Sequence, residues 1–205
     1  MSKIEKAKII NLPLSKEDVL NLHTGDFVLI NGVIVTGRDK IHEYLFKKTK
    51  EEIKLKYDLK GSIIYHCGPI VKKSKEGYSV ISAGPTTSMR MEMYEHALIS
   101  RYGIRGIMGK GGMGEKTHKS MIEYGCVYLN TIGGAATYLA ERVDKVLDVW
   151  MLEEFGMVEA MWILKVKDFP SIVTMDTYGN NLHKKIKNTS SKTLKRLFKH
   201  IHQNI

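Results

Sequence analysis

The sequence predicts an α/β fold with a mixed, partly parallel sheet flanked by helices. Between residues 62 and 143, short apolar segments alternate with segments of helical periodicity, and glycines mark most boundaries. This alternation is typical of parallel strands joined by helical crossovers. The segments after residue 145 are richer in β-type residues, so the sheet is expected to be mixed. With 205 residues, 43% of them apolar, the chain can bury a core, and residues 1–205 are expected to form a single domain.

The first 22 residues predict an extended lead-in followed by a short helix. Isolated apolar residues between positions 1 and 14 fit an extended segment. Ser15, with Asp18 three residues later, resembles a capping box, in which side chain and backbone amide bond reciprocally across the first turn. A helix is therefore expected to start after Ser15 and to end near Leu22.

The next segment predicts a hairpin and then a helix. Asn31-Gly32 interrupts the apolar run 27–36, and Asn-Gly accepts the positive φ angles of a type I′ turn between two strands. Asp39 is the expected N-cap of a helix over residues 40–52. Arg38 then lies at the strand-to-helix corner, where functional residues are common.

Periodicity and turn residues define the remaining elements. A loop is expected at 72–77 and a turn at 176–181. The remaining strands are predicted at 62–67, 78–82, 104–108, 126–130, 146–151, 160–166 and 171–175, and the remaining helices at 86–102, 115–124, 133–143 and 190–202. The last helix belongs to a basic tail, residues 186–205.

Charge and cysteine content narrow the function classes. The net charge of +10 is explained first by many surface lysines, and an acidic substrate or an acidic partner subunit fits it as well as nucleic acid does. Zinc-finger spacing, an RNP-like aromatic stretch and a helix-turn-helix pattern are all absent, so nucleic acid is not the favoured partner. The sequence has no apolar run of membrane-spanning length and no signal-peptide pattern at its start. With two widely separated cysteines, Cys67 and Cys126, a reduced, cytoplasmic protein without a membrane partner is expected.

The glycine loop 109–114 formally matches the dinucleotide motif G-x-G-x-x-G. That motif also needs an acidic residue about 20 positions later to bind the ribose, and the segment 129–131 offers none. A phosphate-binding Walker loop is excluded, because Gly111 follows Lys110 where Ser or Thr is required. A non-catalytic anion- or nucleotide-binding module nevertheless stays open as an alternative.

Two loops together predict a pocket for a small carboxylate. Gly109 and Gly111 flank Lys110 before a predicted helix, so backbone amides, a positive helix end and an ammonium group would face one anion. In the other loop, Arg90 lies one helical turn after Thr86 and can share its face. A guanidinium binds a carboxylate through two parallel hydrogen bonds.

These segments are similar to one known family of hydro-lyases. The chain resembles the β subunit of two-subunit class I fumarases, which is also the C-terminal domain of single-chain class I fumarases and the β subunit of L-tartrate dehydratase. The resemblance covers residues 12 to 185 and leaves the basic tail outside. It rests on Gly84–Met91, Gly109–Met113, Thr36–Asp39 with His42, Ile132–Ala136, Glu159–Trp162 and Asp168–Pro170.

The resemblance implies a swivelling β/β/α domain and half of an active site. The family interconverts fumarate and L-malate, and its [4Fe-4S] cluster is held by three cysteines of the α portion, so neither cysteine of this chain would bind it. Two α and two β chains are expected. Thr86 matches the residue proposed to take the proton from malate C3, and the residues that hold the substrate carboxylates match Arg38, Thr87, Arg90 and Lys110.

Some alternatives remain open within and beyond the family. L-tartrate dehydratase would use the same four-carbon diacid clamps. Thr86 could orient the substrate while another group takes the proton, since a threonine hydroxyl is a poor base in water. A nucleic-acid role for the basic tail would show a steep loss of binding with salt.

Overall fold

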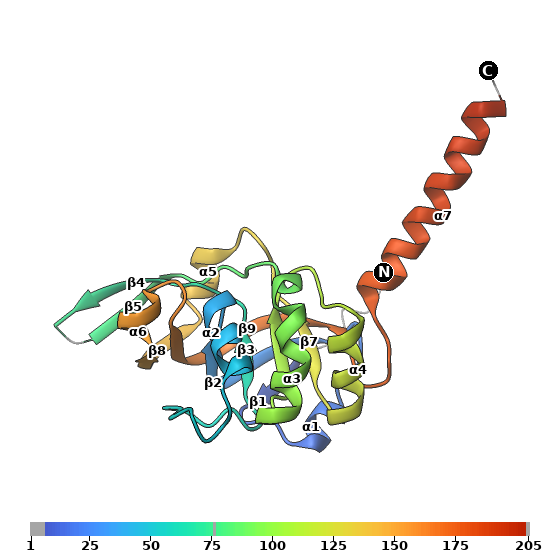
Figure 1. The fold of residues 1–205 in the computed structure, drawn as a ribbon. Coiled ribbons are helices and arrows are strands. Elements are labelled where there is room, and N and C mark those ends of the chain that lie inside the picture. The colour runs from blue at the N-terminus through green and yellow to red at the C-terminus, as the bar shows by residue number, and fades with distance from the viewer. Residues whose placement is uncertain (1–6, 76, 204–205) are drawn as a thin grey trace.

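The computed structural model describes residues 7–75 and 77–203, and in them a mixed sheet is flanked by helices (Figure 1). The main sheet has the strand order β1-β2-β3-β6-β7-β9-β8 within these residues. Its strands are β1 (Lys8–Asn11), β2 (Phe27–Thr36), β3 (Ile63–Tyr65), β6 (Gly106–Gly109), β7 (Val127–Asn130), β8 (Val143–Trp150) and β9 (Met161–Met175). The helices are α1 (Lys16–Leu20), α2 (Asp39–Lys47), η1 (Ser88–Met91), α3 (Glu92–Tyr102), α4 (Glu115–Tyr124), α5 (Ala136–Ala140), α6 (Leu152–Phe155) and α7 (Leu182–Gln203).

The pairing pattern confirms the predicted mixed sheet. Strands β1, β2, β3, β6 and β7 pair in parallel, whereas β8 and β9 pair antiparallel. The long strand β9 also pairs with both β2 and β7, so five strands form a closed ring of pairings. Helices α2, α3 and α4 lie together on one face of the sheet (Figure 1). One apolar cluster lies between these helices and the sheet, and a second contains Trp162 and Phe169 of β9.

The predicted hairpin at Asn31-Gly32 is wrong, because β2 continues through these residues as one strand. Gly32 has the expected positive φ of 114°, but it forms a β-bulge where the register with β9 shifts. The side-chain oxygen of Asn31 accepts a hydrogen bond from the backbone amide of Asp168. The backbone of Asp168 itself has a positive φ of 49°. Both halves of β2 pair with β9, so a long-range partner converts a local turn signal into a bulge.

Other boundaries also differ from the predictions. The segment 72–74, expected in a loop, belongs to a two-stranded ribbon of β4 (Ile70–Ser74) and β5 (Gly77–Ser82). The predicted strands 160–166 and 171–175 form the single strand β9, in which Pro170 is accommodated. Helix α7 begins at Leu182, eight residues before the predicted start at Ser190. The capping box of Ser15 and Asp18 is confirmed.

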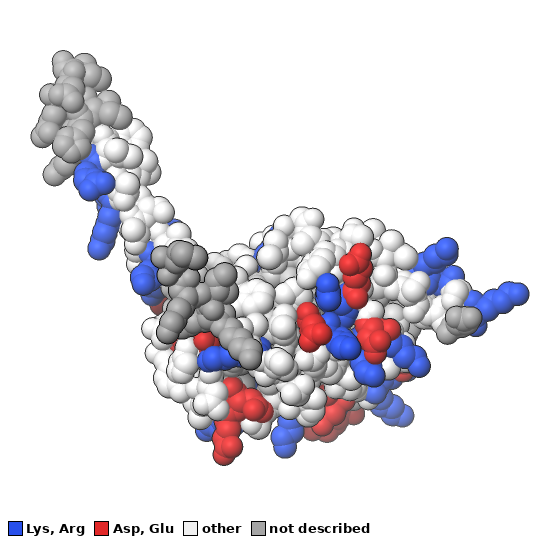
Figure 2. All heavy atoms as spheres, turned by 180° about the vertical axis from the view of Figure 1, so that it is seen from behind, with Lys and Arg blue, Asp and Glu red and all other residues white. Residues whose placement is uncertain are grey.

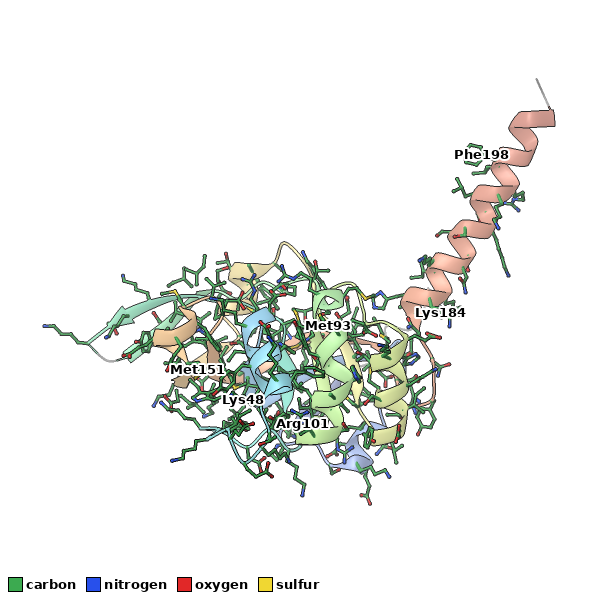
Figure 3. The ribbon with its side chains drawn as sticks, in the orientation of Figure 1. Lys48, Met93, Arg101, Met151, Lys184 and Phe198 are labelled. Atoms are coloured by element: carbon green, nitrogen blue, oxygen red, sulfur yellow. The ribbon has the colours of Figure 1, made fainter. Side chains whose placement is uncertain are left out.

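Helix α7 leaves the body and projects away from it (Figures 1 and 3). Its first turn contacts the body through His183, whose Nε2 lies 2.9 Å from Thr174 Oγ1, and through Lys184, whose Nζ lies 3.2 Å from Glu115 Oε1. Within residues 7–75 and 77–203, no helix is both long and apolar enough to cross a membrane.

Candidate functional site

Three loops are joined by backbone hydrogen bonds at the carboxyl ends of the parallel strands. The amide of Thr86 donates to the carbonyl of His66 (N···O 2.7 Å), and the amide of Lys110 donates to the carbonyl of Thr86 (3.3 Å). The amide of Ser88 donates to the carbonyl of Lys110 (3.0 Å), which sets Thr87 beside Lys110 in a parallel bridge. Because the carboxyl ends of parallel strands meet at one edge, loops from β3 and β6 come together here.

A network of charged side chains connects this edge to the corner between β2 and α2. The Nη2 atom of Arg90 lies 2.9 Å from Asp39 Oδ2 and donates to Thr86 Oγ1 at 3.1 Å. The Nη2 atom of Arg38 lies 4.0 Å from the same Asp39 oxygen, and its Nε lies 3.3 Å from Glu159 Oε1. The two predicted arginines therefore meet around one carboxylate.

The structure brings the predicted site residues to one edge of the sheet. Thr87, Arg90 and Lys110 are exposed, and Thr86 is half-buried. The side chain of Arg38 is 22% exposed and is linked to the others through Asp39. The site is thus an open, cationic surface with hydroxyl groups beside it.

Asp39 and Glu159 are site residues that the sequence reasoning missed. Asp39 was expected as an N-cap, but it is the first residue of α2, Arg38 occupies the cap position, and the carboxylate of Asp39 pairs with Arg90. Glu159 pairs with Arg38 and accepts the amide of Lys40 (3.0 Å). The only feature of the local sequence that could have indicated a site role is the acidic residue Asp39 next to Arg38 at the start of a helix. A bound carboxylate ligand would compete with Asp39 for Arg90.

The helix after the glycine loop already has an anionic partner. Glu92 accepts the amides of Gly114 (2.7 Å), Lys116 (3.1 Å) and Thr117 (3.2 Å) at the start of α4. The positive helix end expected to face a ligand therefore already has a partner, because the carboxylate of Glu92 takes the place of an external anion. What the loop offers a ligand is the exposed side chain of Lys110 and the exposed backbone at Gly111, whose φ is 88°.

Gly109 lets the loop pass close to a buried hydrogen bond. A Cβ at this position would lie 2.1 Å from Ser88 Oγ, which lies 2.7 Å from Tyr128 Oη. We expect Gly109→Ala to lower the free energy of unfolding by about 1–3 kcal/mol through overpacking. Urea denaturation of the purified chain measures this change.

The matched control for this prediction is Gly133→Ala. The nearest atom to a Cβ there is Lys110 Cδ at 3.8 Å, which is ordinary contact. Its expected change is within about 0.5 kcal/mol, as for other surface substitutions. Equal destabilisation by the two variants would contradict the close approach at Gly109.

A fully buried cluster of His42, Glu95 and His66 lies beneath the open edge. One oxygen of Glu95, Oε2, lies 2.8 Å from His42 Nε2 and 3.1 Å from His66 Nε2, and all three side chains are 0% exposed. His42 Nδ1 lies 2.8 Å from the carbonyl of Arg38, and the carbonyl of His66 holds the amide of Thr86. The cluster is therefore bonded directly to the backbone of two predicted site residues.

The charges within the cluster follow from its burial and contacts. Burial alone would raise the pKa of Glu95, but the attraction of His42 and the close contacts of both imidazoles lower it. Burial opposes protonation of His42, yet the attraction of Glu95 raises the pKa of that imidazole. Burial lowers the pKa of His66 and keeps it neutral. A buried imidazolium–carboxylate pair results, with a second imidazole bonded to it.

The same three side chains are the one group, within the described ranges, that could hold a metal ion. Both imidazoles converge on a single carboxylate oxygen: His66 Nε2 is hydrogen-bonded to Glu95 Oε2 at 3.1 Å, and His42 Nε2 lies 2.8 Å from the same oxygen as an ion-pair contact. Cys67 and Cys126 do not suit an iron–sulfur cluster: both are buried, and burial raises the pKa of the Cys67 thiol to about 12 and that of Cys126 well above its usual value. This chain therefore offers no thiolate set for such a cluster.

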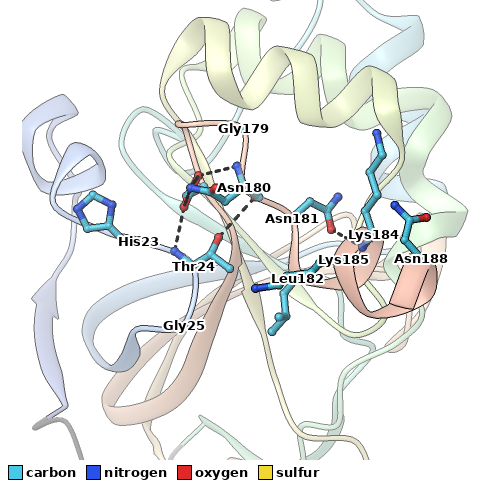
Figure 4. Close-up of a pocket in the computed structure, with 11 residues that line it drawn as sticks. His23, Thr24, Gly25, Gly179, Asn180, Asn181, Leu182, Lys184, Lys185 and Asn188 are labelled. Atoms are coloured by element: carbon cyan, nitrogen blue, oxygen red, sulfur yellow. Dashed lines mark hydrogen bonds between the residues drawn. The ribbon is translucent and has the colours of Figure 1, made fainter. Parts of the chain in front are cut away.

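A separate pocket of about 660 Å³ lies at the root of α7 (Figure 4). The amides of Thr24 and Asn180 donate to the carboxylate of Asp176 at 2.9 and 3.0 Å. These bonds hold the loop that carries Thr24 against the turn that carries Asn180. None of the predicted site residues lines this pocket. Its polar groups serve the local loop structure, so the candidate site stays at the strand ends.

Comparison of the sequence with known proteins identifies its family. A model described as Fumarase C-terminus matches residues 1–186. The chain is 49% identical over 186 residues to a putative class I fumarate hydratase from Geobacillus stearothermophilus, an alignment that covers 90% of this chain and 35% of that protein. The chain therefore spans about a third of the length of this relative.

Two further relatives match over most of their own length. The chain is 45% identical over 174 residues to a putative L(+)-tartrate dehydratase subunit beta from Methanocaldococcus jannaschii, with 84% of this chain and 89% of the relative covered. It is 38% identical over 177 residues to the L(+)-tartrate dehydratase subunit beta of Escherichia coli, with 85% and 86% covered. The resemblance inferred from the sequence is thus confirmed, and the chain belongs to the fumarase C-terminus family of class I fumarate hydratases and L(+)-tartrate dehydratase β subunits.

Proposed function

We propose that this chain is the β subunit of a class I fumarate hydratase and catalyses the reversible hydration of fumarate to L-malate together with an α subunit. The observation that carries the proposal is the grouping of Arg38, Thr86, Arg90 and Lys110 at one open edge. Family membership adds that related chains are fumarate hydratase or tartrate dehydratase proteins. Hydro-lyase chemistry on a small dicarboxylate fits both the grouping of these residues and the family membership.

The open geometry supports a site that is completed by a second chain. Placed cations stabilise developing negative charge best where water is excluded, and Arg90 and Lys110 are exposed here. A partner that covers this edge would exclude water and complete the pocket. Relatives named as β subunits support an α subunit as that partner, in an assembly for which we propose two copies of each chain.

In the proposed site, the cationic side chains bind the two carboxylates of the substrate. In the dehydration direction, a proton leaves malate C3 while the hydroxyl leaves C2, and negative charge builds beside a carboxylate. Thr86 is the proposed acceptor of the C3 proton, and the Arg90 guanidinium, 3.1 Å from Thr86 Oγ1, would favour the alkoxide form. A [4Fe-4S] cluster in the α subunit would supply a Lewis acid for the departing hydroxyl.

L(+)-tartrate dehydratase is the second candidate. Two relatives that match over most of their length carry that name. Tartrate has a hydroxyl on each central carbon where malate has one, and the clamps on this chain suit either diacid. The cluster-bearing surface of the partner would then select between them.

Anaerobic assays of fumarate hydration and tartrate dehydration test this proposal. The chain alone is compared with the chain plus its α subunit after reconstitution with iron and sulfide. We expect activity only when both subunits are present, and we expect oxygen to abolish it. The diacid that is converted faster then shows whether the enzyme is a fumarate hydratase or a tartrate dehydratase. Activity of this chain without iron would overturn the shared-site mechanism. Inactivity of a stable complex on both diacids would overturn the substrate class, and nucleotide binding lost in Gly111→Ala would favour a binding module.

A further inference from the structure

Helix α7 is an amphipathic arm without an intramolecular partner along most of its described length. Its 22 residues span about 33 Å at the usual rise of an α-helix. The family match ends at residue 186, near the point where α7 leaves the body (Figure 1). Most helix stability in proteins comes from tertiary packing of an apolar face rather than from the intrinsic propensity of the helix. Packing against another surface would therefore stabilise the exposed part of α7.

The arm carries an apolar stripe on one face and cations on the other. Ile186, Leu194, Leu197 and Phe198 are each 53–55% exposed, and their spacing places them along one side of the helix. Residues 182–203 include seven Lys and Arg residues and no Asp or Glu. Figure 2 shows the basic side chains along the projecting part of α7, whereas the body mixes both signs. An apolar groove rimmed by acidic residues is the complementary surface.

The arm rises from the side of the molecule that carries the candidate site. In Figure 3, Met93 lies at the end of α3 nearest the site loops, and Arg101 lies at the opposite end. Helix α7 starts near Lys184 and projects beyond the Met93 end. The root also touches the glycine loop, because the imidazole of His183 fills the space beside Gly112, where a Cβ would meet it at 2.6 Å. A protein seated over the strand ends would lie alongside α7.

We propose that α7 is a docking arm for the α subunit, and that its apolar stripe binds an apolar, acid-rimmed groove on that subunit. This inference rests on the proposed function, because it names the chain that completes the same site. A second copy of α7 fits poorly, since two helices with seven cations each repel. A lipid surface also fits poorly: Ser190 and Thr193 occupy the stripe between Ile186 and Leu194, which leaves two turns without an apolar side chain. Phosphate contacts of a nucleic acid would leave the stripe uncovered.

Titration of the full-length chain with the α subunit tests the arm. Leu194→Ser combined with Leu197→Ser should weaken the complex by about tenfold or more, as expected for buried interface anchors. The matched control, Ile70→Ser with Ile81→Ser, removes apolar residues of similar exposure (57% and 49%) from the β4–β5 ribbon and should leave the affinity unchanged. Raising the salt concentration should weaken the wild-type complex more than that of a chain ending at Lys185, which lacks five of the seven cations.

Affinity and turnover separate this inference from the proposed function. At saturating α subunit, the Leu194→Ser, Leu197→Ser chain should reach the wild-type kcat, because the arm does not touch the reacting atoms. Unchanged affinity of this variant would overturn the docking arm, even if the enzyme is active. If the complex forms through α7 but has no activity on either diacid, the proposed function is overturned and the docking role of α7 is supported. Binding of the wild-type chain through α7 to anionic vesicles, to duplex DNA or to itself, with α-subunit affinity unaffected, would also overturn it.

Discussion

Replacing Arg90 or Lys110 with Ala should each lower the kcat/KM of the assembled enzyme by about 10²–10³-fold, the usual effect of removing one group that stabilises charge in the transition state. Arg90 contacts Thr86 Oγ1 and Asp39, so its loss removes both a clamp and the cation beside the proposed base. Lys110 lies beside Thr87 on the adjoining loop. Steady-state kinetics on fumarate and malate, with the α subunit in excess, measure both effects.

The comparison of Arg90→Lys with Arg90→Ala sharpens this expectation. A lysine keeps the charge but cannot reproduce the two-pronged contact of a guanidinium, so it should recover part of the loss. Lys119→Ala removes an exposed cation from α4, outside the site, and should stay near wild type. Values within twofold of wild type for Arg90→Ala or Lys110→Ala would remove that residue from the site.

Replacing Glu95 with Ala should lower the free energy of unfolding by about 3–5 kcal/mol, because removal of one partner leaves a buried ion uncompensated. The carboxylate holds both His42 and His66 at 0% exposure. The control Glu43→Gln breaks the exposed, solvent-screened pair with Lys47 on α2 and should leave the stability nearly unchanged. Urea denaturation of the isolated chain measures both, and a loss at Glu95 no larger than the control would contradict the buried ion pair.

The pH dependence of this effect has a definite sign. The pKa of Glu95 is lowered in the folded chain, so its stabilisation is present above its unfolded value of 4.5 and is lost as pH falls toward the folded value. The pKa of His42 is raised, so its stabilisation is present below 6.5 and is lost as pH rises through the folded value. The stability difference between wild type and Glu95→Gln should therefore be largest between about pH 4.5 and 6.5. A difference independent of pH would contradict the ion pair.

Local patterns in the sequence were sufficient for much of the fold. The helix 115–124 and the strands around 63–65 and 127–130 match their predictions, because each is a short periodic segment bounded by glycine or polar residues. The mixed sheet followed from the order of such segments. The family likewise followed from two loops and a few short motifs, since glycines and charged residues at strand ends are local features.

Contacts between residues far apart in the chain could not be predicted from local patterns and are visible only in the folded structure. Asn31-Gly32 is a bulge and not a turn because β9, which lies far along the chain, pairs with both halves of β2. The amides at the start of α4 are occupied because Glu92 reaches them from α3. His42, His66 and Glu95 come from separate elements, and periodicity carries no information about which buried polar groups will meet. The kinds of elements and the chemistry of the loops can be predicted from the amino-acid sequence, because they depend on neighbouring residues. Which charges neutralise one another, and which remain open to a ligand or a partner, depended on long-range packing that only the folded chain creates.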